Sequence, residues 1–165
     1  MAKLTLTGFD EYYSKLERLG AESENVCKKA VYQGAKVLAD QISDSINSLP
    51  AVKEVDNLKA YKSGEKSQLS IAQKKGLKDG LGIAPFKIEG GAINTSIGFD
   101  GYNSIKTKKY PNGQPNQLIA RVVESGSSYM DKKPFIRPSV NQAKTNVINA
   151  MKEVIDEEFN KIMEG

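Results

Sequence analysis

The stretch ESGSSYMDKKPFIRP, from Glu124 to Pro138, marks the sharpest change of pattern in this chain. The run before it, residues 117–123 (QLIARVV), has the composition of a β-strand and predicts one. Residues 125–128 (SGSS) then interrupt any regular pattern. We therefore expect a strand that ends at Glu124, followed by a break in regular structure.

Two prolines at the end of this stretch predict how the last helix begins. Pro134 and Pro138 bracket Phe135, and the residue before each proline is biased toward extended geometry. We therefore expect a stiff extended connector over residues 133–138, with Phe135 buried between the terminal helix and a sheet. Pro138 suits the first turn of a helix, where the missing N–H is not needed. Apolar residues at helical spacing then predict a helix over residues 139–163.

The N-terminal part of the chain predicts two further helices. A short apolar alternation at residues 4–7 leads into a helix that starts with Asp10 as its N-cap and ends at Gly20. A longer helix is expected over residues 22–48, because apolar residues recur there every three or four positions. Leu49-Pro50 ends it.

The middle of the chain predicts loops and short strands. Residues 51–66 hold few apolar side chains, so we expect a mobile loop, and residues 67–76 predict a short helix capped by Ser67. Residues 81–88 and 93–99 predict two strands, joined by a hairpin turn at Glu89-Gly90-Gly91. Together these elements predict an α+β fold in one domain over residues 1–165. In it, a small antiparallel sheet packs against two long amphipathic helices, and long mobile loops connect the rest.

A second long loop is predicted over residues 104–116, where lysine, glycine, proline and asparagine dominate. Basic and aromatic side chains alternate in and beside it: Tyr102, Lys106, Lys108, Lys109 and Tyr110. Such a mixture can contact a nucleic-acid backbone, and it can equally be a solubilising loop. If the loop instead docks on a protein partner, Tyr102, Tyr110 and Pro111 are the expected anchors.

Composition argues against several classes of function. The chain has 165 residues, a net charge of +4, no histidine, no tryptophan and one cysteine, Cys27. Without histidine, the commonest general base and metal ligand is missing. One carboxylate pair, Asp100 with Glu124, could form where two expected strands end. We expect no enzyme, no metal or other cofactor, no small-molecule substrate and no membrane span, and a protein made in a cytoplasm.

Three stretches together resemble a known family. They are the opening LTLTGFDEYYSKLERLG with the helix VCKKAVYQGAKVLADQI, the pair IGFDGYN and YPNGQPN, and RVVESGSSYMDKKPFIRPSV. The last matches a signature of the form E-x-G-[ST]…P-F-[ILM]-R-P-[AS]. The chain resembles the neck or tail-completion (minor tail, head–tail joining) proteins of long-tailed double-stranded DNA phages and prophages. Residues 51–80 depart from the pattern of that family.

The resemblance implies a structural subunit and no catalysis. The implied protein forms a homo-oligomeric ring, for which a hexamer is one candidate, and joins heads to tails in the virion after assembly in the bacterial host cytoplasm. Other neck and tail proteins are the implied partners. On this hypothesis, we expect the interface residues to be among Tyr102, Tyr110, Pro111, Glu124, Gly126 and Arg137. The residues that would face DNA in transit are Lys106, Lys108 and Lys109. The expected structural residues are Pro134, Phe135 and Pro138. The alternative is a small basic nucleic-acid-binding module.

Overall fold

The computed structural model describes the backbone of residues 9–164 and the side chains of residues 14–164. The apolar alternation at residues 4–7, expected as a small strand or an extended lead-in, lies outside the described residues. The expected N-cap, Asp10, already lies within the first helix, which includes Phe9. The elements follow in the order α1 (Phe9–Ser48), α2 (Glu54–Lys62), α3 (Ile71–Gly80), β1 (Leu81–Ile83), β2 (Lys87–Glu89), β3 (Ala92–Asn94), β4 (Ile97–Phe99), α4 (Asn116–Ser125) and α5 (Ile136–Glu164). The predicted α+β class with two long helices is confirmed.

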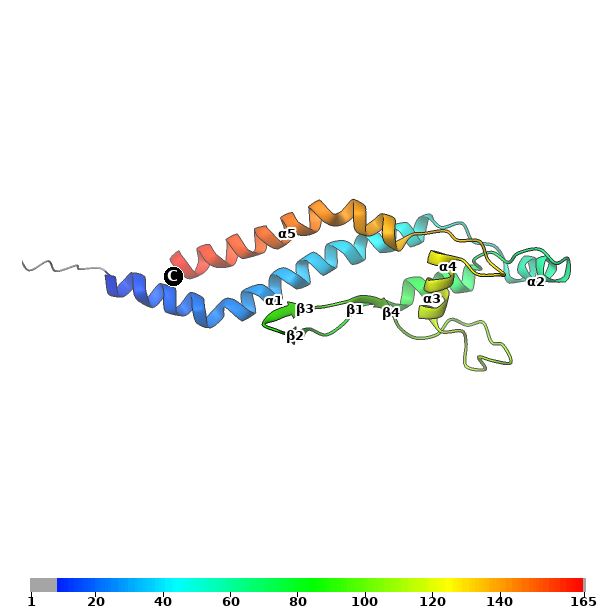
Figure 1. Cartoon of the computed structure of the whole chain (residues 1–165), viewed down its shortest axis with the longest axis horizontal. Helices are drawn as coiled ribbons and strands as arrows, with labels where there is room; N and C mark the ends of the chain where they lie inside the picture. Colours follow the sequence, from blue (N-terminus) through cyan, green and yellow to red (C-terminus); the bar gives the residue numbers. More distant parts are fainter. Residues whose placement is uncertain (1–8, 165) are drawn as a thin grey trace, which may run out of the picture.

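The molecule is elongated, and its long axis follows α1 (Figure 1). α1 has 40 residues and spans about 60 Å at 1.5 Å per residue. α5 packs along one side of it, the β-strands lie along the other, and α2, α3 and α4 gather at one end (Figure 1). The predicted helix break at Gly20 is wrong: the residue is exposed and meets nothing that forces the chain to turn, so α1 runs through it.

Small residues let α1 and α5 approach closely. Ala30 of α1 and Ala143 of α5 are buried, and the hydroxyl oxygens of Ser45 and Ser139 lie 2.7 Å apart across the pair. A Cβ atom at Gly34 would lie 2.8 Å from Cγ of Met151, closer than packed carbon atoms approach. Gly34 therefore leaves the room that the side chains of Met151 and Val147 occupy between the two helices.

Replacing Gly34 with leucine is expected to lower the free energy of unfolding by about 1–3 kcal/mol, because an overpacked interface must shift to make room. The matched control is Gly20→Leu on the same helix, which meets no other atom and replaces a poor helix former with a good one. Urea unfolding followed by circular dichroism measures both. A Gly34→Leu protein as stable as the Gly20→Leu protein would contradict this account of the helix contact.

The β-region consists of two short antiparallel pairs. β1 pairs with β4, with Leu81 opposite Phe99, and β2 pairs with β3, with Ile88 opposite Ile93. The predicted hairpin turn is confirmed: Gly90 and Gly91 have φ angles of 59° and 80°, which glycine adopts readily. The two predicted strands are each broken in two. Pro85 lies in one break, where the Ala84 N–H bonds to the Ser96 carbonyl and holds the ribbon together.

Three predictions for short segments were wrong. Residues 51–66 are not an irregular loop, because they contain α2. The next helix, α3, is capped by Ser70 and not by Ser67: Ser70 and Gln73 exchange the two hydrogen bonds of a capping box. The predicted strand at residues 117–123 is the helix α4, bounded by Pro115 and Gly126. In a run this short, apolar residues at every second position also lie four residues apart, which is about one turn of a helix.

The expected connector over residues 133–138 is extended only in part, because α5 already begins at Ile136. Pro138 does lie in the first turn of α5, as predicted. Phe135 is 2% exposed and packs in the core, and its ring meets that of Phe99 in β4 edge to face with centroids 6.0 Å apart. The prediction that Phe135 is buried is confirmed.

Candidate interaction surfaces

A single carboxylate joins the end of α4 to the start of α5. Glu124 Oε2 accepts hydrogen bonds from the backbone N–H groups of Phe135 (2.7 Å) and Ile136 (2.8 Å), and Oε1 accepts one from Arg137 (3.0 Å). The first N–H groups of a helix have no partner within it, so Glu124 takes the place of an N-cap residue from another helix. Both oxygens of Glu124 are thus engaged at this helix start, and the carboxylate pair with Asp100 that the sequence left open is not formed.

The pKa of Glu124 is lowered from its ordinary value. Burial on its own raises the pKa, but the hydrogen bonds from Ile136, Arg137 and Phe135, together with the charge of Arg137, outweigh it. The positive end of the α5 dipole points at the same carboxylate. This junction therefore stabilises the ionised form of Glu124 relative to the protonated form.

The residues after Glu124 make the return to α5 possible. Gly126 ends α4 with a φ angle of 77°, and a Cβ atom there would lie 3.1 Å from the Lys132 nitrogen. Ser127 Oγ accepts hydrogen bonds from the N–H groups of Tyr129 and Met130 and closes a tight turn. Glu124 and Gly126 were expected at an interface, and the structure gives both of them a role within the chain. Arg137, Pro134 and Pro138 are exposed.

The loop over residues 100–115 presents the other candidate residues. Tyr102 and Pro111 are exposed and Tyr110 is half-buried, with the Lys109 ammonium 5.5 Å from the centre of its ring. All three lysines of this loop, at positions 106, 108 and 109, are exposed. The loop is folded onto itself: Asn103 is buried, and its N–H bonds to the Gln114 carbonyl at 2.9 Å.

An apolar groove of about 560 Å³ is lined by residues of this loop and of α2. α2 lies at the right-hand end of the molecule in Figure 1. Leu58 and Tyr61 of α2 form one wall, Ile105 of the loop lies opposite, and Tyr129 and Met130 complete the lining. Tyr61 is 78% exposed, and none of the α2 residues is buried. Sequence reasoning missed this groove because it missed α2.

Polar contacts fix α2 beside the groove. Asn57 bonds to the backbone of Gln68 through both its amide nitrogen and its amide oxygen, each at 2.8 Å. Glu54 accepts a hydrogen bond from the Ala72 N–H in the first turn of α3. The bond from its own backbone N–H and the one from Ala72 lower the pKa of Glu54. Burial of apolar side chains therefore contributes little to the position of α2.

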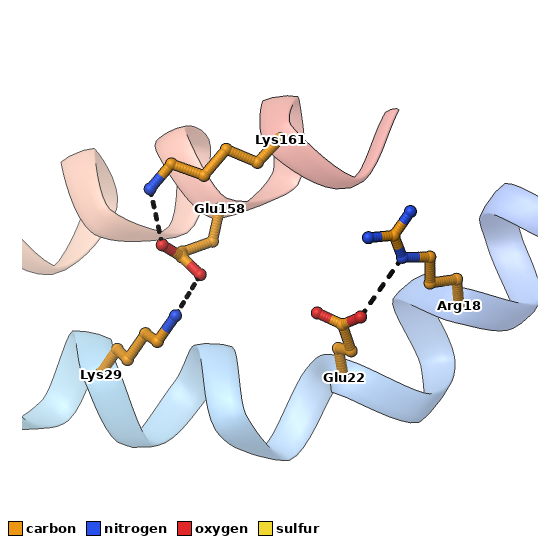
Figure 2. A network of polar contacts seen from close by, with 5 residues as sticks. All are labelled: Arg18, Glu22, Lys29, Glu158 and Lys161. Atoms are coloured by element: carbon orange, nitrogen blue, oxygen red, sulfur yellow. Dashed lines mark hydrogen bonds and ion pairs between the residues drawn. The ribbon is translucent and has the colours of Figure 1, made fainter. Parts of the chain in front are cut away.

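The opposite end of the molecule is acidic. Glu158 of α5 lies between Lys29 of α1 and Lys161 of its own helix, and these hydrogen bonds lower the pKa of Glu158 and raise that of Lys161 (Figure 2). Glu153 and Asp156, about two turns and about one and a half turns before Lys161, form no ion pair with another described residue. Ile155 and Phe159 in the same turns are 41% and 42% exposed.

Within residues 14–164, no group of three or more cysteine and acidic side chains is placed to bind a metal ion. Of the helices over the described residues, none is both long and apolar enough to cross a bilayer. Comparison with known proteins finds no family model that matches this chain, and no curated protein or solved structure that resembles it significantly.

Proposed function

We propose that this protein is a structural subunit of a ring at the head–tail junction or tail end of a long-tailed phage. The observation that carries the proposal is the junction between α4 and α5. The residues of the family signature that lie far apart in the sequence, Glu124 and Phe135-Ile136-Arg137, meet in one hydrogen-bonded unit. A match to the signature whose residues also contact one another in the structure is more specific than a match of residue types alone.

The shape of the subunit supports an assembly role. The chain is elongated (Figure 1). Apolar side chains are exposed at the groove beside α2 and on the last turns of α5. Apolar patches rimmed by polar residues are typical of protein–protein contacts. The proposed partners are further copies of the chain and other neck or tail proteins.

Deleting the gene from the phage or prophage that encodes this chain tests the proposal. The expected result is filled heads and separate tails in electron micrographs, with joining restored when the protein is supplied from a plasmid. Normal virions from the deletion strain would overturn the proposal.

The same complementation assay distinguishes docking from DNA contact by the loop. We expect Tyr102→Ser/Tyr110→Ser to fail in joining heads to tails, because the exposed aromatic surface for a partner is lost. The matched control replaces Lys106, Lys108 and Lys109 with glutamine and should still join them, since DNA in transit needs only weak contacts. The opposite pattern would contradict docking by the tyrosines.

The alternative function, a nucleic-acid-binding module, is favoured by one observation: three exposed lysines and two tyrosines share this loop. It predicts that the purified protein binds double-stranded DNA with an affinity that falls steeply with salt, and that the triple glutamine variant loses this binding. Filter binding at two or more salt concentrations measures it.

A further inference from the structure

The two ends of the molecule carry opposite charge. Residues 51–135, which form the end with the groove together with the β-region, hold 14 Lys and Arg against 8 Asp and Glu, a net charge of +6. Residues 153–164, the last three turns of α5, hold five acidic residues against one lysine, a net charge of −4. Figure 1 places α2 and the end of α5 at opposite ends of the long axis.

Each end also combines its charge with exposed apolar side chains. At the groove, Leu58 and Tyr61 are flanked on α2 by the exposed Lys59 and Lys62, and the exposed Lys106 and Lys108 adjoin the lining residues Ile105 and Thr107. The acidic residues there are fewer: Glu54 lines the groove, and Asp56 lies 3.8 Å from Lys59. On α5, Ile155 and Phe159 are flanked by Glu153 and Asp156. An apolar centre with a charged rim is the composition of a specific protein contact, and here the rims of the two surfaces are opposite in net charge.

We infer that the acidic end of α5 from one copy docks in the groove beside α2 of a second copy. This contact extends the proposed function, because it names the surfaces through which the subunits of the ring would join. Like-with-like contacts are disfavoured: two α5 ends would bring net negative charge together, and two grooves would bring net positive charge together. Contact between the α5 end of one copy and the groove of another pairs opposite charges. Repeated head-to-tail contact gives a ring when its rotation closes.

The contact has a further physical consequence. Lys59 and Lys62 lie in the last turn of α2, where the helix dipole favours positive charge, so this end of α2 attracts an acidic surface. The contact also makes the association sensitive to salt, because the charged rims stay close to solvent.

A charge-exchange experiment tests the contact with purified full-length protein. One variant, Lys59→Glu/Lys62→Glu, makes the groove rim acidic, and the other, Glu153→Lys/Asp156→Lys, makes the α5 end basic. Analytical ultracentrifugation over a range of concentrations measures self-association. We expect wild-type protein to associate, and each variant alone to associate at least about tenfold more weakly, because like charges then face each other. Lys36→Glu, an exposed position in the middle of α1, is the matched control and should behave as wild type.

The decisive sample is an equimolar mixture of the two variants. The acidic groove of the first variant fits the basic α5 end of the second. The unchanged groove of the second variant fits the unchanged α5 end of the first, as in wild type. Self-association should therefore return in the mixture. Three outcomes would overturn the inference: wild-type protein that stays monomeric, no recovery in the mixture, or a groove variant that loses DNA binding while its self-association is unchanged. None of these outcomes decides whether the protein joins heads to tails, because the gene deletion tests that proposal separately.

Discussion

Replacing Phe135 with alanine is expected to lower the free energy of unfolding by about 3 kcal/mol. The ring is almost fully buried, and it packs edge to face on Phe99, so its loss leaves a cavity and removes an aromatic pair. Phe135 is also the residue whose N–H bonds to Glu124 at the start of α5. The backbone is also held at Lys133, whose N–H bonds to the Val123 carbonyl, and at Ile136, whose N–H bonds to Glu124, so it can relax into the cavity only in part.

Thermal and urea unfolding measure this effect, and Phe86→Ala is the matched control. Phe86 lies between β1 and β2 and is 36% exposed, so its replacement should cost less than half as much. Equal stabilities for the two alanine variants would show that Phe135 does not hold the terminal helix to the β-region.

The second large effect is expected at Glu124. Replacing it with alanine leaves three N–H groups at the start of α5 without their carboxylate partner, and the free energy of unfolding should fall by on the order of 3 kcal/mol. Glu124→Gln keeps an oxygen acceptor without the charge and should fall between the alanine variant and wild type. Glu65→Ala, at an exposed position, is the control for removing a carboxylate and should change little.

The contribution of Glu124 should also depend on pH. Its pKa in the folded protein lies below the ordinary value, so the folded state binds fewer protons than the unfolded state between the two pKa values. The stability difference between wild type and Glu124→Gln should be complete above the unfolded pKa of about 4.3. It should shrink as the pH falls through the lower folded pKa. A difference that stays constant from pH 6 to pH 2.5 would contradict the assigned role.

Patterns that extend over many residues predicted the fold well. The long helices were found because their apolar residues repeat over several turns, and the hairpin was found because Gly90-Gly91 allows few other conformations. Phe135 was placed correctly because two prolines fix the local chain direction. In each case, a strong local preference agrees with the final structure.

Short elements were harder to predict from the sequence, and the reason is physical. In residues 117–123, Leu118, Ala120 and Val122 alternate as in a strand, but Leu118 and Val122 are also one helical turn apart. Pro115 before the run and Gly126 after it were the signals that could have identified the helix α4. α2 is held by Asn57 and Glu54 through backbone atoms of distant residues, and a sequence does not reveal such contacts. The groove beside α2 could not be predicted for the same reason.

The pairing of α1 with α5 has a consequence for how the chain is made. About 90 residues separate the two helices in the sequence, so the face of α1 around Gly34, which meets Val147 and Met151, has no partner until the ribosome has synthesised α5. Residues 49–135 alone take roughly 4–17 seconds at a rate of about 5–20 residues per second. During that time this face of α1 is exposed on the nascent chain and is available to chaperones. Synthesis of α5 is therefore the event that allows the contact between the two long helices to form.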